Sequence, residues 1–390
     1  MTEWKTYKLG ELVKVKGGKR LPKGISLQIV PNTHPYIRIR NMGKSRVLEL
    51  DATYEYVDDV TQKSIARYVV EEGDILLSIV GTIGLVGIVG KSLHQANQTE
   101  NCVKLVNLNG IDPLFLYYFL LSPKGQEEIK RGTVGAVQAK LPIKNIENIE
   151  ISLPPLAEQR RIAGILGAID DKIENNRRIN TNLELQAQAL FDKIFFDDKD
   201  VERNPLSDYA NINPTRTLRQ GVIARYIEMA NLPTKGSFPS DWSYKSYGGG
   251  CKFANGDTIM ARITPCLENG KTAYIDFLEE QEVAFGSTEY IVISAKSGYC
   301  PALFYFLARN KEFVDYAVGH MNGSSGRQRV GGVDVANFPM PHITLEDSNK
   351  FAEIAMPIMD VIRNNSLENR QLATLRDTLL PKLMNGEIKI

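Results

Sequence analysis

Residues 162–194 read IAGILGAIDDKIENNRRINTNLELQAQALFDKI, and residues 351–383 read FAEIAMPIMDVIRNNSLENRQLATLRDTLLPKL. In both stretches, apolar or asparagine residues recur at alternating steps of four and three. This spacing is the a and d pattern of a coiled coil, and it is sustained over more than four heptads. Each stretch is therefore predicted to be a long helix that pairs with the other along an apolar seam.

The two stretches belong to an internal repeat that covers the chain. Residues 114–156 align with residues 301–343 at an offset of 187, and the two helical stretches align at an offset of 189. The order is therefore globular, helical, globular, helical. We place the four segments at residues 1–153, 154–200, 201–341 and 342–390.

The direction of pairing follows from the connection between the helices. A helix of roughly 40 residues is about 60 Å long, and a parallel pair would force the second globular segment to bridge that length. We therefore expect an antiparallel pair. In the best register Asn176 faces Asn369 and Asn180 faces Asn365, and these buried amides would penalise slipped alignments. The same register pairs Ile173 with Leu372, Leu183 with Ile362, and Ile194 with Phe351.

Charged residues interrupt the seam or lie near it. Arg376 takes a seam position opposite Ile169, and we expect its stem to pack while its head reaches solvent. Asp170 and Asp171 are expected on a solvated face of the first helix.

The globular segments read as mixed α/β (α+β) folds. Hydrophobic residues make up 43% of the 390 residues, which excludes global disorder, and the formal net charge of +1 excludes a uniformly basic coat. The apolar run 75–89 is short and rich in glycine, so it is predicted to form neighbouring strands rather than a membrane span. Four scattered cysteines and a start without an apolar leader favour a cytoplasmic location.

Basic residues gather in early loops of each globular segment. The first segment has 20 basic and 16 acidic side chains, a net charge of +4, which is compatible with phosphate contacts or with an ordinary solvated face. The candidate DNA contacts here are Lys14, Lys16, Lys19, Arg20, Lys23, Arg38, Arg40 and Lys44, followed by Arg46. The second copy offers Arg216, Arg219 and Arg225.

A glycine-containing polar loop precedes the last strand of each segment. Residues 132–144 read GTVGAVQAKLPIK, and residues 319–330 read GHMNGSSGRQRV. Such side chains read base edges and phosphates, and glycine lets a backbone approach a ligand closely; a plain flexible loop is the alternative. The candidates are Gln138, Lys140, Lys144, Asn322, Ser324, Ser325, Arg327, Gln328 and Arg329, with Gln138 and Gln328 as the predicted base contacts.

Catalytic motifs are lacking in this sequence. The four histidines show no metal-ligand spacing, and there is no Walker A loop or nucleophile elbow. The glycines at 81, 84, 87 and 90 lack the strand and helix context of a nucleotide loop, so tight turns are expected there. The sequence predicts a binding protein with two recognition domains on a paired helical support, without a catalytic or metal site.

Four short motifs are shared with a known family. They are residues 153–162 (LPPLAEQRRI), 169–173 (IDDKI), 7–12 (YKLGEL) and 73–76 (GDIL). Together with the segment order, they make the chain resemble the specificity subunit of a type I restriction–modification enzyme. The second copy departs from the pattern, since residues 341–346 (PHITLE) lack the AEQRRI text, and its partner contacts are expected to differ.

The resemblance implies a non-catalytic role in a larger complex. Each globular segment would be a target-recognition domain that reads one half of a split, asymmetric site in double-stranded DNA. The helices would separate the halves and dock two modification subunits, which bind S-adenosylmethionine and methylate adenine. Motor–nuclease restriction subunits would use ATP and Mg²⁺.

Two other classes of function remain open from the residues alone. One is a coiled-coil scaffold whose globular segments bind proteins or carbohydrate, which salt-dependent binding to duplex DNA would distinguish. The other is a methyltransferase or nuclease that acts alone, which turnover by the isolated chain would reveal.

Overall fold

The computed structural model describes residues 4–43, 45–198, 200–324 and 326–388. The chain divides into two compact units, each described separately below. The first unit combines residues 1–174 with residues 371–390, and the second comprises residues 175–370. Among the described residues, no helix combines the length and apolarity that crossing a bilayer requires.

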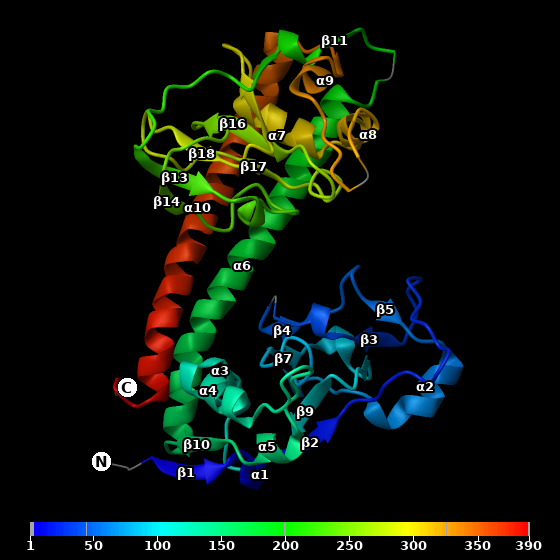
Figure 1. Ribbon diagram of the computed structural model, residues 1–390, viewed down its shortest axis with the longest axis vertical. Helices are drawn as coiled ribbons and strands as arrows, with labels where there is room; N and C mark the ends of the chain where they lie inside the picture. Colours follow the sequence, from blue (N-terminus) through cyan, green and yellow to red (C-terminus); the bar gives the residue numbers. More distant parts are fainter. Residues whose placement is uncertain (1–3, 44, 199, 325, 389–390) are drawn as a thin grey trace. The chain divides into compact units, whose positions relative to one another are not determined.

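The two predicted long helices are α6 (Leu156–Phe195) and α10 (Leu345–Met384) (Figure 1). Pro154 and Pro155 directly precede α6, as suits a proline that lacks a backbone donor. After α10, Gly386 takes a positive φ of 70°, a conformation typical of the residues that end a helix. Both predicted helices are confirmed, and each is unbroken.

The globular part of the first unit is built on a mixed sheet in the order β2-β9-β6-β7-β4, with a smaller sheet β5-β3-β8 and a separate pair β1-β10. Its strands are β1 (Lys5–Lys8), β2 (Lys14–Gly17), β3 (Pro35–Ile37), β4 (Val47–Leu48), β5 (Glu55–Tyr56), β6 (Ile75–Ser78), β7 (Val86–Val89), β8 (Asn97–Gln98), β9 (Cys102–Val106) and β10 (Glu150–Leu153). Its helices are α1 (Leu9–Leu12), α2 (Asp59–Ile65), α3 (Pro113–Leu121), α4 (Pro123–Gly132) and α5 (Ile143–Glu147).

The globular part of the second unit has the sheets β12-β19-β16-β17 and β14-β13-β18-β15 and the pair β11-β20. Its strands are β11 (Arg203–Pro205), β12 (Ala210–Ile212), β13 (Ile223–Ile227), β14 (Ser243–Ser246), β15 (Lys252–Phe253), β16 (Asp257–Ala261), β17 (Thr272–Tyr274), β18 (Ala284–Gly286), β19 (Tyr290–Ala295) and β20 (Pro339–Pro341). Its helices are α7 (Pro301–Arg309), α8 (Lys311–Gly319) and α9 (Gly332–Ala336).

The sheet orders confirm the internal repeat. The central run β2-β9-β6-β7 has the same order as β12-β19-β16-β17, and the parallel pair β3·β8 recurs as β13·β18. The apolar run 75–89 forms β6 and β7, and the turn between them contains Gly81 and Gly84 at positive φ. The mixed α/β prediction is confirmed, and the apolar run belongs to the sheet.

The repeated Gly-Asp motif has a structural explanation. Gly73 and Gly256 both have φ near +86° (85° and 87°), which glycine adopts without strain. The carboxylate of Asp74 accepts from the backbone of Glu71 and from Lys104 at 2.8 Å, and the carboxylate of Asp257 accepts from Ala254 at 2.8 Å. In both copies the aspartate closes the turn before a buried strand, so the motif supports the fold.

Inside the second unit, α6 and α10 run antiparallel with the predicted asparagine register. The Nδ2 of Asn176 donates to the Oδ1 of Asn369 at 3.0 Å, and Asn365 donates to Asn180 at 2.8 Å. Leu183 packs in the same cluster as Ile362. These contacts confirm the register, because an alignment shifted by one heptad would place Asn176 and Asn180 opposite Ile362 and Ile358.

The seam departs from the prediction near the end of α6. Ile194 is 41% exposed, and Phe191 and Phe195 contact the ring of Phe351 at centroid distances of 5.8 and 5.7 Å. The predicted pair of Ile194 with Phe351 is therefore wrong. In a straight α-helix, positions seven residues apart rotate by about 20° relative to a strict 3.5-residue period. Far along α6, Phe191 and Phe195 therefore face α10 in place of Ile194.

In the first unit, Leu380, Leu383 and Met384 of α10 share a core with Ile162 and Leu166 of α6. The antiparallel direction therefore holds here too.

A polar cluster crosses the helix pair in the first unit. The guanidinium of Arg376 donates to Asp170 at 2.8 Å, and the Oη of Tyr118 on α3 donates to the same carboxylate at 2.7 Å. The expectation of a solvated Asp170 is wrong, since its side chain is only 12% exposed, whereas Arg376 stays 31% exposed and also pairs with the exposed Asp377. A carboxylate next to both a cation and a hydroxyl is stabilised away from water, which sequence spacing alone does not show.

The second unit uses an equivalent tyrosine. Tyr305 on α7 aligns with Tyr118, and its Oη donates to Glu184 of α6. Burial raises the pKa of Glu184, while the hydrogen bond from Tyr305 opposes that shift. In each unit a buried tyrosine therefore ties the aromatic helix of the globular part to a carboxylate of α6.

Replacing Asn176 alone by leucine should destabilise the protein by about 1–3 kcal/mol, because the amide of Asn369 loses its partner. Replacing both Asn176 and Asn369 by leucine should restore the parent's stability or raise it further, since an apolar pair suits the seam. Urea unfolding of the two variants measures the difference. A single variant as stable as the double variant would contradict the pairing.

A half-buried carboxyl after β17 makes stability depend on pH. Burial raises the pKa of Asp276 to about 7, against the lowering effect of Arg363, and Asp360 adds to the rise. Since the folded state binds this proton more tightly than the unfolded state, stability should fall as the pH rises from about 4 to about 7. Asp276→Asn should match the parent at pH 4 and be more stable at pH 8 by about 1 kcal/mol or more. Thermal unfolding at both pH values tests this, and an equal gain at both would refute it.

Candidate nucleic-acid interface

The first basic loop lies on and after β2. Lys14 and Lys16 are exposed and Val15 is buried between them, because side chains alternate along a strand. Lys19, Arg20 and Lys23 follow, all exposed. A Cβ on Gly18 would lie 2.0 Å from the carbonyl oxygen of Thr99, so only glycine permits this close approach. The strand and the glycine place this group of cations on one accessible loop.

Several predicted cations already have acidic partners. Arg20 donates to Glu100 at 2.8 Å, while Arg38 and Arg40 lie 2.6 and 2.9 Å from the same oxygen of Glu55. These side chains remain substantially exposed, so they could still contact a phosphate, and the acidic partners fix their directions. Lys44 lies outside the described residues.

Arg46, in contrast, is a structural residue. It donates to the backbone carbonyl of Gly167, ion-pairs with Asp171, and approaches the hydroxyl of Tyr118 at 3.4 Å. Its side chain is mostly buried. The contacts of Arg46 tie the globular part to α6 inside the first unit. They do not support the expectation that Arg46 faces DNA.

The polar loop of the first unit is a small hairpin between α4 and α5. Val134 and Lys140 exchange backbone hydrogen bonds of 2.8 and 2.9 Å. Leu141 then donates to Ile79, which attaches the loop to the end of β6. The side chains of Gln138, Lys140 and Lys144 are exposed on it.

The second unit repeats this hairpin. Asn322 and Arg329 exchange two backbone bonds of 2.9 Å, and Val330 donates to Arg262 just after β16. Asn322, Ser324 and Arg327 are exposed, Gln328 and Arg329 are half-buried, and Ser325 lies outside the described residues. The structure thus gives both polar loops the same construction, although whether they touch DNA remains a prediction.

Two predicted cations of the second copy are turned inward. Arg216 pairs with the buried carboxylate of Asp257 at 2.5 Å. Arg225 is only 11% exposed and binds the Phe277 carbonyl and the carboxylate of Glu282. These contacts give both arginines structural roles and disfavour them as phosphate contacts, whereas Arg219 is exposed.

An aromatic and basic hairpin was missed by the charge-based reading. Lys245 on β14 lies 4.1 Å from the ring centroid of Tyr226 on β13, and Tyr244 beside it is 62% exposed. Lys252 similarly lies over the ring of Tyr247, across a run of three glycines. The alternation of tyrosine and lysine in residues 244–252 could have revealed this surface, since aromatic and basic side chains together suit nucleic acid.

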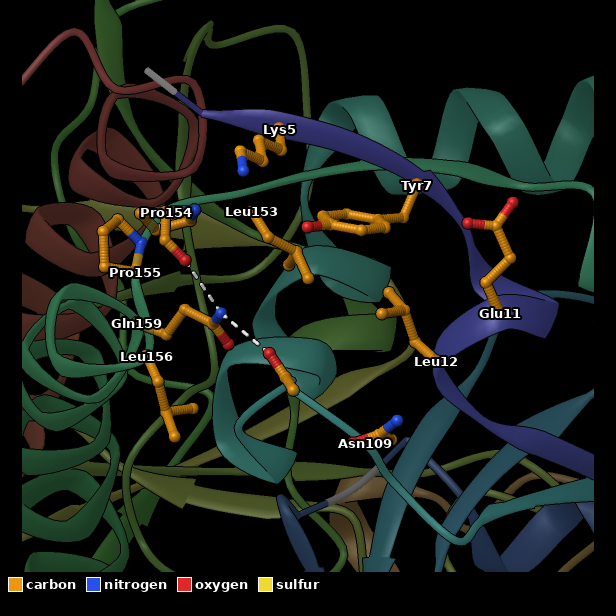
Figure 2. A pocket seen from close by; sticks show the side chains of 11 residues that line it. Lys5, Tyr7, Glu11, Leu12, Asn109, Leu153, Pro154, Pro155, Leu156 and Gln159 are labelled. Carbon is orange, nitrogen blue, oxygen red and sulfur yellow. Dashed lines mark hydrogen bonds between the residues drawn. The ribbon is translucent and has the colours of Figure 1, made fainter. Parts of the chain in front are cut away.

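The LPPLAEQ motif lines a cavity of about 600 Å³ in the first unit, beside β1 and the start of α6 (Figure 2). Gln159 is buried here, and its Nε2 donates to the carbonyls of Pro154 at 2.9 Å and Gly110 at 3.2 Å. Its Oε1 accepts from the backbone of Asp112 at 2.9 Å. All three bonds stay within the protein, so the glutamine joins the loop before α3 to α6.

Ser348 is the counterpart of Gln159 in the second copy, at the offset of 189. It is fully buried, and its hydroxyl accepts from the backbone of Cys300 at 2.8 Å, just before α7. The second copy therefore keeps the same connection with a shorter side chain and fewer bonds. At this position the local connection is therefore kept although the AEQRRI text is absent.

The described residues bring no group of three histidine, cysteine or carboxylate side chains close enough to hold a metal ion. What the site offers chemically is hydrogen-bond donors, cations and aromatic faces on loops. Such groups are of the kinds that contact phosphates and bases in nucleic-acid complexes.

Comparison with known proteins agrees with this composition. Residues 1–185 match the family model of the type I restriction modification DNA specificity domain. The chain is 23% identical to the type I restriction enzyme MjaIX specificity subunit of Methanocaldococcus jannaschii, over 100% of this chain and 94% of the relative. It is 22% identical to the HindI specificity subunit of Haemophilus influenzae, over the full length of both.

A solved structure shares the fold. The S subunit of a type I restriction–modification system from M. genitalium superposes with a TM-score of 0.58 at 15% identity, covering 98% of this chain and 96% of that one. The chain thus contains a DNA specificity domain. Over its whole length the chain is similar to specificity subunits of type I restriction–modification systems.

Replacing Gln159 by alanine should lower the free energy of unfolding by about 2–3 kcal/mol, because three buried backbone groups lose their partner. Ser348→Ala should cost about 1 kcal/mol, since one bond is lost. Urea unfolding measures both. Equal losses would show that the two positions are not used as the contacts indicate.

Proposed function

We propose that this chain reads a bipartite, asymmetric site in double-stranded DNA, with one half-site for each globular part. The observation that carries the proposal is the repeated hairpin: residues 134–140 and 322–329 have the same construction but different side chains. A shared scaffold with different loops is what recognition of two different half-sites requires. The family of the chain supports the same function.

The paired helices would fix the distance between the half-sites. The asparagine pairs support this part of the proposal, because buried amides disfavour the sliding of one helix along the other. A fixed separation predicts a spacer of constant length between the recognised bases, since DNA presents the same groove once per helical turn.

The helices would also dock two modification subunits. Exposed apolar residues at the heptad position beside the seam support this within the second unit: Ile179 on α6, and Ile354 and Val361 on α10. These side chains are 37–49% exposed, although a solvated helix face would normally be polar. Such residues suit the apolar face of a partner's helices.

Catalysis would reside in the partners. The modification subunits would bind S-adenosylmethionine, and restriction subunits would use ATP and Mg²⁺, while this chain contributes recognition only. Cytoplasmic location, with access to DNA, fits the free cysteines Cys102, Cys251, Cys266 and Cys300.

Gln328→Ala should relax base preference in one half-site by about 1–3 kcal/mol at a single position and leave the other half-site unchanged. Lys19→Ala should instead weaken binding evenly over sequences and reduce the salt slope by about 1. Selection of bound duplexes from a random pool, with the chain in its complex, reports both. Wild-type binding without any sequence preference would refute the function itself.

A further inference from the structure

The two hairpins differ in the cation that ends them. Lys140 and Arg329 hold the same position, because each pairs with the first residue of its hairpin and each forms a bridge to the segment after the central strand, at Val80 and Ile263 respectively. Among the described residues Lys140 makes no ion pair, whereas Arg329 binds Glu289. The repeats therefore share the backbone but not the electrostatics.

The carboxylate of Glu289 accepts hydrogen bonds from two nitrogens of the Arg329 guanidinium. The Nε of Arg329 lies 2.9 and 2.8 Å from the two carboxylate oxygens, and its Nη2 donates at 2.7 Å. The Nη1 donates to the backbone carbonyl of Arg327 at 3.0 Å. One guanidinium thus connects the start of β19 to the tip of the hairpin, and the hydrogen bonds from Arg329 lower the pKa of Glu289.

In the first repeat the matching carboxylate, that of Glu100, binds a different partner. Thr99-Glu100 aligns with Thr288-Glu289 at the offset of 189, and Glu100 accepts from Arg20 on the basic loop instead. A lysine has a flexible stem and a point charge, so it cannot hold two acceptors in the fixed geometry of a guanidinium.

We propose that Glu289 is a positioning residue for recognition of the second half-site. This inference rests on the proposed function. It assigns Arg329 to holding the hairpin rather than to contacting phosphate, because its Nε, Nη1 and Nη2 all donate to protein acceptors. The clamp would fix the backbone on both sides of Gln328 before DNA arrives, which reduces the ordering cost of binding. Glu100 would act in the same way on the basic loop of the first copy.

The test compares Glu289→Gln, Arg329→Lys and, as the matched control, Glu100→Gln. Each chain is assayed in its complex, for affinity and base preference on a random duplex pool and for thermal stability. Glu289→Gln should weaken binding to the preferred site about tenfold and broaden base preference in one half-site, with non-specific binding unchanged. Arg329→Lys should weaken binding and broaden base preference in the same way, because lysine keeps the charge but cannot form the paired hydrogen bonds of the guanidinium to Glu289. Glu100→Gln should affect the other half-site.

Two results would overturn the assignment. One is tighter binding to all sequences with a steeper salt slope in Glu289→Gln, together with full function in Arg329→Lys, since these mark Arg329 as a phosphate contact released from its carboxylate. The other is unchanged base preference in a folded Glu289→Gln complex. If the wild-type complex shows no sequence preference, the proposed function fails rather than the positioning role. Glu289→Asp, which keeps the charge, should restore part of the preference and separates positioning from misfolding.

Discussion

The hydrogen-bonded asparagines in the seam between α6 and α10 are the constraint on which the second unit depends. An amide enclosed by apolar side chains is tolerated only opposite a partner, so Asn176 with Asn369 and Asn180 with Asn365 select one alignment. Phe191, Phe195 and Phe351 then pack in that alignment, and the core extends from the helices into the globular part. Polar residues set the register, and aromatic residues supply the buried area.

The attachment of each globular part to the helices is also polar at its centre. Tyr118 and Tyr305 occupy equivalent places on the aromatic helices, and each donates its hydroxyl to a carboxylate of α6. Arg46 and Arg376 complete the cluster in the first unit, whereas Arg309 approaches the hydroxyl of Tyr305 in the second. The repeats thus preserve the type of contact while changing its members, as they do at Gln159 and Ser348.

Sequence patterns predicted what depends on local spacing. The heptads gave both long helices and the asparagine register, and the internal alignment gave the aromatic helices and the equivalent loops. Charge counting was less reliable, because an arginine and its partner can be far apart in the chain: Arg216 lies 41 positions from Asp257, and Arg225 lies 54 from Glu279. Only the fold brings these groups together, so side chains that looked available for phosphate prove to be engaged. Ile194 was misplaced for a different reason, the drift between helical and heptad periods.

The first unit is discontinuous in the chain, since residues 371–390 complete a body begun by residues 1–174. Leu380, Leu383 and Met384 pack against the same core as Ile162 and Leu166, so the apolar face at the start of α6 is not covered by them until residues 380–384 have been synthesised. This body therefore cannot complete its fold before residues 380–384 have been synthesised, and its most distant contacts carry a loop-closure entropy cost. A chain that is truncated before residue 380 would expose the apolar face at the start of α6 and would be a substrate for chaperones or proteases.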